Sequence, residues 1–106
     1  MKIKIPESVK IYGNIYEVKH STDVSTAGNT NGAIHFSSLK IFIDPESSPQ
    51  VQHDAFLHEI LHDILRKSGL STRLCKLDED LEEDIIIAMT TGWYQVITDN
   101  DFIEKE

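Results

Sequence analysis

The feature that most constrains this chain is the stretch FLHEILHDIL, which runs from Phe56 to Leu65. Two histidines, His58 and His62, lie four residues apart in it, and Glu59 directly follows the first of them. The apolar residues around them recur at the i, i+3, i+4, i+7 and i+8 spacing of one buried helical stripe. They are Leu57, Ile60, Leu61, Ile64 and Leu65. The stretch therefore predicts an amphipathic helix that carries two imidazoles at the edge of its apolar face.

Signals at both ends place this motif helix at about residues 49–68. Ser48 offers a capping hydroxyl, and Pro49 suits the first helical position because its missing N–H costs nothing there. At the other end Ser68-Gly69 supplies the stop, preceded by two basic residues that suit the helix dipole. The helix is thus predicted independently of the histidines that it carries.

The spacing of the polar residues on this helix predicts a metal site. His58 and His62 lie only about 40° apart around the helix axis and one turn along it, so their rings project side by side. Two imidazole nitrogens in that position can both approach one Zn²⁺ at about 2.0–2.1 Å. Glu59 lies about 100° away from His58, too far round to be a comfortable ligand. It can still reach a water on the open side of the metal, which is the place for a general base.

A catalytic zinc also needs a third protein ligand and an open position. One completion of the His-Glu-x-x-His pattern has a glycine and a third histidine shortly after, but Leu65 and Ser68 stand at those places. The other completion takes a carboxylate from a later helix. Glu82 and Glu83 lie 20 and 21 residues beyond His62, at the start of a second predicted helix, and periodicity does not choose between them.

The segment before the motif helix predicts strands, at about residues 9–44. Val9 to Tyr12 and Ile15 to His20 flank Gly13-Asn14, a two-residue turn signal for a hairpin. Ala33 to Phe36 and Leu39 to Ile43 form a second candidate hairpin, in which alternate residues of the later strand share one apolar face. We therefore expect two antiparallel hairpins in the first half of the chain.

After the motif helix we expect a polar connection that contains Cys75, and then a second helix at about residues 79–98. Asp78 or Asp80 can cap that helix, and acidic residues crowd its first turn, as the helix dipole favours. Its expected apolar face comprises Ile85, Ile86, Met89, Trp93 and Val96. Strands followed by helices predict one α+β domain over residues 1–106.

Composition narrows the classes of function. The 106 residues include 18 acidic and 10 basic side chains, for a formal net charge of −8, which disfavours binding to a phosphate backbone. The single Cys75 excludes an internal disulfide and suits a reducing compartment. No apolar run has the length of a membrane helix or of a signal peptide. We expect a soluble cytoplasmic protein that binds neither nucleic acid nor membrane, and whose partners are polypeptides and cations.

Three segments together resemble the zincin metallopeptidases, specifically the small gluzincins of the ImmA/IrrE kind found in phages and mobile elements. They are the strand pair GAIHFSSLKIFID, the motif HEILH and the later helix EEDIIIAMTTGWYQVI, which span about residues 32–100. The resemblance implies a minimal zincin-like domain. In that family the second helix supplies a glutamate followed three, six and seven residues on by small or apolar positions. Ile86, Met89 and Thr90 fall there, which favours Glu83 over Glu82 as the third ligand.

The resemblance also implies an activity: hydrolysis of a peptide bond in an intracellular protein or peptide by a metal-activated water. In this reading His58, His62 and Glu83 hold Zn²⁺. Glu59 takes a proton from the water and passes it to the leaving amine. An edge strand, Ala33 to Phe36, holds the substrate extended by main-chain pairing.

Some residues and functions are left as alternatives. Tyr94 and His35 are candidate donors for the developing oxyanion. The main rival function is a noncatalytic zincin-fold regulatory or binding protein of a phage or mobile element, because fold does not fix function. A minor rival is a metal phosphohydrolase, since His53-Asp54 and His62-Asp63 each spell the dipeptide used by enzymes of the HD kind.

Overall fold

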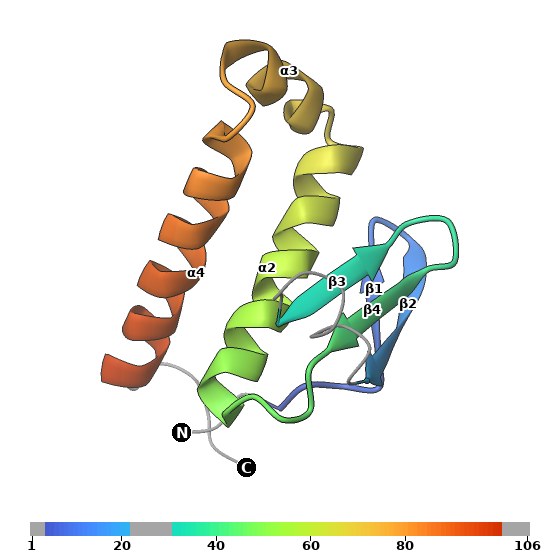
Figure 1. Ribbon diagram of the computed structural model, residues 1–106, viewed down its shortest axis with the longest axis vertical. Helices are drawn as coiled ribbons and strands as arrows, with labels where there is room; N and C mark the ends of the chain where they lie inside the picture. The colour runs from blue at the N-terminus through green and yellow to red at the C-terminus, as the bar shows by residue number, and fades with distance from the viewer. Residues whose placement is uncertain (1–3, 22–30, 101–106) are drawn as a thin grey trace.

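A computed structural model describes residues 4–21 and 31–100 of the chain as an α+β arrangement of a mixed sheet and three helices. The elements are β1 (Ser8–Ile11), β2 (Asn14–His20), β3 (Gly32–His35), β4 (Lys40–Ile43), α2 (Pro49–Lys67), α3 (Leu70–Leu77) and α4 (Leu81–Asp99). Figure 1 shows α2 between the sheet and α4, with α3 joining the far ends of the two long helices. The chain therefore builds three layers around its motif helix.

The sheet has four strands in the order β1-β2-β4-β3. Both predicted hairpins are confirmed, because β1 pairs antiparallel with β2, and β3 pairs antiparallel with β4. The two hairpins join through a parallel pairing of β2 with β4, which leaves β3 at an edge of the sheet. That edge strand lies beside α2 (Figure 1).

The turn of the first hairpin lies one residue earlier than predicted. The prediction placed Gly13-Asn14 in the turn, but Asn14 opens β2 and pairs with Ile11. The turn residues are Tyr12 and Gly13, with φ angles of 48° and 86°. A two-residue turn with positive φ at both positions matches the twist of the flanking strands of a hairpin. Tyr12 therefore adopts the left-handed backbone conformation, which is uncommon for residues other than glycine, and the strand register is kept.

The core lies between the sheet and α2. Ile41 and Ile43 are both fully buried on one face of β4, as the alternation predicts, and Tyr16 and Val18 of β2 join them. From α2 the buried apolar residues are Ala55 and Phe56, together with the polar Glu59 and Asp63. The predicted stripe of leucines and isoleucines is only partly buried. The sheet and α4 cover different sides of α2. The buried residues of α2 therefore lie outside the single apolar stripe that the sequence predicts.

Both ends of α2 are confirmed. The Ser48 hydroxyl accepts a hydrogen bond from the Val51 backbone N–H at 3.3 Å, and Pro49 is the first helical residue. At the C-terminus Ser68 is the cap, and Gly69 follows with φ of 85°, a conformation that glycine adopts at little cost.

The expected polar connection is wrong, because α3 occupies that segment and contains Cys75. Leu70, Leu74 and Leu77 lie at the i, i+4 and i+7 spacing of a helix, but the run is only eight residues long and most of its other residues are polar, so the pattern is easily read as a connection.

The second predicted helix is confirmed as α4, with its start two residues later and its end one residue later than expected. Among the described residues, Asp80 holds the N-cap position without a side-chain cap bond, and Asp78 accepts the Asp80 backbone N–H at 2.9 Å instead. The expected apolar face is wrong in part. Met89 and Trp93 are 50% and 46% exposed, and Val96 is also exposed. The buried residues are Ile86, Thr90 and Ile97, and among the described elements α4 packs against α2 and α3.

No helix in the described ranges has the length and apolar character needed to cross a membrane.

Candidate metal centre

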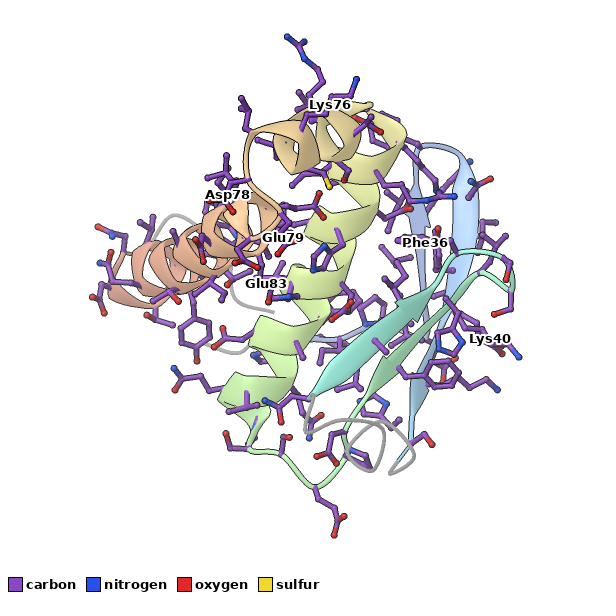
Figure 2. All side chains as sticks on the ribbon, turned by 45° about the horizontal axis from the view of Figure 1, so that its top comes forward. Phe36, Lys40, Lys76, Asp78, Glu79 and Glu83 are labelled. Atoms are coloured by element: carbon purple, nitrogen blue, oxygen red, sulfur yellow. The ribbon has the colours of Figure 1, made fainter. Side chains whose placement is uncertain are left out.

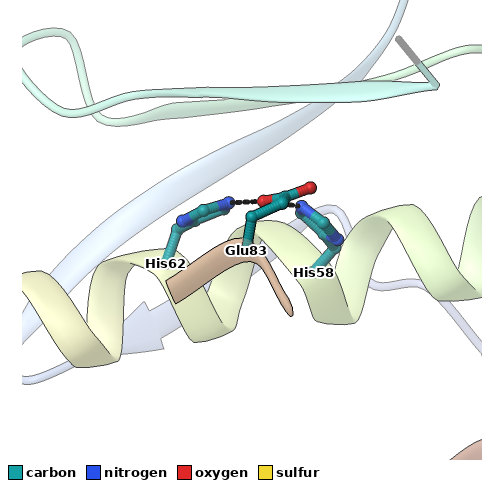
Figure 3. A group of neighbouring side chains, drawn as sticks. All are labelled: His58, His62 and Glu83. Carbon is teal, nitrogen blue, oxygen red and sulfur yellow. Dashed lines mark hydrogen bonds and ion pairs between the residues drawn. The ribbon is translucent and has the colours of Figure 1, made fainter. Parts of the chain in front are cut away.

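Three side chains from two helices converge at the middle of α2. The ligand atoms of His58, His62 and Glu83 all lie within 4.8 Å of one another. Figure 3 shows the two imidazoles side by side, with the Glu83 carboxylate reaching across from α4. Glu83 Oε1 lies 3.1 Å from His58 Nε2 and 3.0 Å from His62 Nε2. The structure thus brings together the two histidines and the carboxylate that the sequence singles out.

The fold explains this convergence. The i, i+4 spacing puts both imidazoles on one side of α2. The chain then turns through α3 so that α4 runs back alongside α2 (Figure 1). This reversal brings the first turn of α4, with its acidic residues, against the histidines.

The two adjacent acids of α4 make different contacts. Glu83 Oε1 approaches Nε2 of both rings, whereas Glu82 Oε2 lies 2.7 Å from Nδ1 of His62. Glu82 therefore touches the nitrogen of His62 that faces away from the shared centre. The geometry separates two carboxylates that periodicity alone leaves equivalent.

Glu59 lies beside the centre and takes no part in the cluster of possible ligand atoms. It is 8% exposed, and burial raises the pKa of its carboxyl to about 7. The nearby His62 lowers this pKa and the Glu83 carboxylate raises it, but both effects are smaller than that of burial. A carboxyl group with a pKa near neutrality can both accept and donate a proton at physiological pH.

A cavity of about 380 Å³ connects Glu59 with the cluster. His58, Glu59 and Glu83 line it, together with Thr90 of α4 and Gly32 of the edge strand. The general-base candidate and two of the three possible ligands therefore face the same space.

A second cavity, of about 470 Å³, lies on the other side of Glu83, which lines both. It is lined by His62 and Glu82 and by two residues at the end of the edge strand, Ile34 and Phe36. Arg66 of α2 lies over the Phe36 ring, 4.2 Å from its centroid. The edge strand thus runs past the cluster from one cavity to the other.

The edge strand approaches α2 closely at Gly32. A Cβ built there would lie 3.1 Å from the Ala55 Cβ and 3.2 Å from the Phe42 carbonyl oxygen. It would also lie 3.6 Å from Cγ of Glu59. The start of β3 therefore packs directly over the residues that surround the general-base candidate.

Asp63, next to His62 in sequence, faces the sheet and not the cluster. It is fully buried, accepts the Tyr16 hydroxyl at 3.0 Å and forms an ion pair with Lys67 at 2.7 Å. Lys67 Nζ also donates to the Ile11 carbonyl oxygen at 3.4 Å. Because its oxygens are turned into the core, Asp63 does not form a shared metal site with His62.

Tyr94 and His35 are not among the residues that line either cavity beside the cluster. His35 is exposed at the end of β3, where its ring lies 4.8 Å from that of Phe42. The structure therefore does not bring either candidate oxyanion donor to the site.

Sequence reasoning named Asp54 only in the His-Asp dipeptide of the phosphohydrolase alternative and did not place it beside this cluster, where it lines the first cavity one turn before His58. Its Oδ1 is buried without a hydrogen-bond partner among the described residues, and burial raises its pKa. The spacing of four residues from His58 is a signal that could have pointed to it.

The donor set fits a divalent transition metal. Two imidazole nitrogens and one carboxylate oxygen form a common ligand set of catalytic zinc, which keeps one position open. Ligands of a tetrahedral Zn²⁺ lie roughly 3.4 Å apart, as follows from bond lengths of about 2.0–2.1 Å. The three ligand atoms all lie within 4.8 Å of one another, a separation comparable to that spacing.

No protein-family model matches the chain, and no curated protein or solved structure is significantly similar to it.

Proposed function

We propose that the protein is a zinc-dependent metallopeptidase with a minimal zincin-like fold, acting on a protein or peptide inside the cell. The observation that carries the proposal is the convergence of His58, His62 and Glu83, with Glu59 beside them in the same cavity. The resemblance of the HEILH helix and its flanking segments to the small gluzincins supports the same conclusion.

His58, His62 and Glu83 are the residues that would hold the ion. When bound, Zn²⁺ supplies Lewis acidity, which polarises a carbonyl oxygen and lowers the pKa of a water to about 7. The first cavity provides room for that water and for part of a substrate, because Glu59, His58 and Glu83 all line it.

Glu59 has the proton-transfer role. It accepts a proton from the water whose oxygen forms a bond with the peptide carbonyl carbon. It then delivers the proton to the amine nitrogen as the C–N bond breaks, which leaves a free carboxyl group and a free amine. The near-complete burial of Glu59 suits this exchange, because a desolvated carboxyl group holds a proton more readily.

The edge strand is the candidate support for an extended substrate. Among the described strands β3 pairs with β4 alone, and residues of β3 line both cavities. A peptide that added to the other side would gain main-chain hydrogen bonds and place its side chains into the cavities. Ile34→Pro is expected to reduce cleavage while zinc content stays unchanged, and cleavage at the wild-type rate would exclude this binding mode.

The test of the function separates metal binding from chemistry. Protein purified without chelator is expected to contain one zinc per chain by elemental analysis, and His58→Ala is expected to contain almost none. Glu59→Gln is expected to keep its zinc and to lose cleavage. A proteomic comparison of cells that express wild type or Glu59→Gln identifies the substrate as the protein cut only by wild type.

A noncatalytic binding protein is the second candidate, and one observation favours it. Met89, Trp93 and Ile87 are exposed on α4, and Ile87 also lines the first cavity. Exposed apolar residues beside a site are typical of a surface that binds another protein. Stoichiometric zinc together with identical proteomes for wild type and Glu59→Gln would establish this candidate and exclude the peptidase.

A further inference from the structure

We propose that Glu82 is a positioning residue for the metal centre: its carboxylate accepts the Nδ1–H of His62 and so directs Nε2 of that ring to the ion. The inference rests on the proposed function, because it assumes that the cluster binds a metal. It assigns Glu82 a role distinct from that of its neighbour Glu83, which would be the ligand.

The hydrogen-bonding chemistry of imidazole carries the first step. A neutral imidazole has one N–H, so a ring that binds an ion through Nε2 carries its proton on Nδ1, where an acceptor can hold it. Glu82 Oε2 lies 2.7 Å from Nδ1 of His62, at the short end of charge-assisted hydrogen bonds. With the proton held on Nδ1, the lone pair on Nε2 faces His58 and Glu83, where the ion would lie.

The degree of burial carries the second step. The side chains of Glu82 and His62 are 21% and 25% exposed, whereas that of Glu83 is 48% exposed. The contact between Glu82 and His62 is therefore less screened by water than the contacts of the ligand itself. The helix dipole favours any negative charge near the helix N-terminus, whereas this contact is directed at one ring nitrogen of His62.

The two rings are not equivalent in this respect. His62 contacts a carboxylate through each of its nitrogens. Within residues 4–21 and 31–100, His58 has a recorded polar contact only through Nε2, to Glu83. Of the two proposed ligands, His62 is thus the one whose orientation is set before an ion arrives. Partners of this kind fix the ring tautomer and raise the basicity of the coordinating nitrogen.

Glu79 provides a matched control. It lines the same cavity as His62 and Glu82 and carries the same charge, but it is exposed. Figure 2 shows Glu79 and Glu83 near the start of α4, on its flank toward α2. Glu79→Ala removes one negative charge from this region and leaves the hydrogen bond to His62 intact.

The experiment measures Zn²⁺ affinity by competition with a chromophoric chelator at fixed pH and salt. Glu82→Ala is expected to weaken binding about 10–100-fold, the usual cost of losing such a partner. Glu82→Gln keeps an acceptor oxygen and is expected to recover most of the affinity. Glu79→Ala is expected to change it less than about threefold, because an exposed charge at a distance is screened.

A second readout distinguishes positioning from a general effect on folding. In the zinc-loaded, nitrogen-15-labelled protein, the Nδ1–H proton of His62 is expected to give a slowly exchanging NMR signal. The signal is expected in wild type and in Glu82→Gln, and to be absent in Glu82→Ala. Thermal unfolding of the metal-free variants shows whether each is folded before its affinity is interpreted.

Equal affinities of Glu82→Ala and Glu79→Ala would overturn this inference alone. So would a wild-type protein that binds zinc but lacks the Nδ1–H signal of His62. A wild-type protein that holds no zinc under any of these conditions would overturn the proposed function and this inference with it. The two failures are therefore distinguishable.

Discussion

The two sides of α2 carry polar clusters of opposite character, although His62 and Asp63 are neighbours in the chain. On the sheet side Asp63 is fully buried, and both of its oxygens are occupied, by Tyr16 and by Lys67. On the α4 side His62 lies at a partly exposed centre where carboxylates outnumber fixed cations. The first cluster is electrostatically closed, whereas the second has a set of ligand atoms that could hold a cation.

This contrast shows how one helix can both anchor a fold and carry a site. A buried charge is tolerated when its partner is held in place, and it is costly when the partner is missing. The Asp63 cluster meets this condition within the chain itself. The cluster around Glu83 sets two carboxylates against two imidazoles, a donor set that could hold a cation.

Breaking the closed cluster is expected to have the largest effect. Lys67→Met leaves the Asp63 carboxylate buried without its cation, and should lower the free energy of unfolding by about 3–5 kcal/mol. Urea denaturation measures this change. Lys76→Met, on the exposed α3, is the control and is expected to stay within about 0.5 kcal/mol. A loss below about 1 kcal/mol for Lys67→Met would show that the two sides of α2 do not differ as described.

Filling the open cluster is expected to stabilise the protein. At a free Zn²⁺ concentration 100 times the dissociation constant, the gain in unfolding free energy is about 2.7 kcal/mol by mass action. His58→Ala is expected to show no such gain at the same concentration. The measurement is thermal unfolding with and without zinc, and an equal gain in both proteins would place the ion somewhere other than this cluster.

The pH dependence of Glu59 sharpens the comparison in the metal-free protein. The pKa of the Glu59 carboxyl group is about 7 in the folded state and near 4.5 when exposed. At pH values between these two, the chain therefore takes up a proton when it folds. Stability contributed by this group is therefore lost as pH rises from about 4.5 to about 7. Glu59→Gln does not titrate, and is expected to exceed wild type by on the order of 2 kcal/mol at pH 8.

The same comparison at pH 4 is expected to show almost no difference, because Glu59 is then protonated in both states. Urea denaturation at the two pH values provides the measurement. A difference that did not change with pH would contradict the desolvation of this carboxyl group.

The smallest effect is expected for Glu83→Ala in the metal-free protein. Its contacts are to imidazoles, and its side chain is half-exposed, so the unfolding free energy should change by less than about 0.5 kcal/mol. Zinc affinity should nevertheless fall more than about 100-fold, beyond the cost of losing a positioning residue. A large loss of metal-free stability would indicate a structural role for Glu83.

The parts of the fold that sequence predicts well are those set by local chemistry. The limits of α2 follow from Ser48 and Pro49 at one end and Gly69 at the other, since each acts within a turn of its own position. The pairing of His58 with His62 is likewise a property of a single helix. These predictions require no knowledge of the rest of the chain.

The parts that sequence misses depend on contacts between distant segments. Helical periodicity leaves the choice between Glu82 and Glu83 open, because the choice depends on how α4 is rotated against α2, and only the resemblance to the gluzincins favoured Glu83. The exposure of Met89 and Trp93 has the same origin, because only one side of α4 meets α2 and α3. The parallel pairing of β2 with β4 joins two hairpins and is encoded in neither of them.

The close approach at Gly32 has a consequence for how this protein can change. Gly32 has only a hydrogen atom at the place where other amino acids have a Cβ atom. That place lies close to Ala55, to the Phe42 carbonyl oxygen and to Glu59. One added methyl group would have to move Ala55 or the Phe42 carbonyl by a few tenths of an ångström. Substitution there would alter which molecules fit beside Glu59, whose Cγ the added carbon would contact at 3.6 Å.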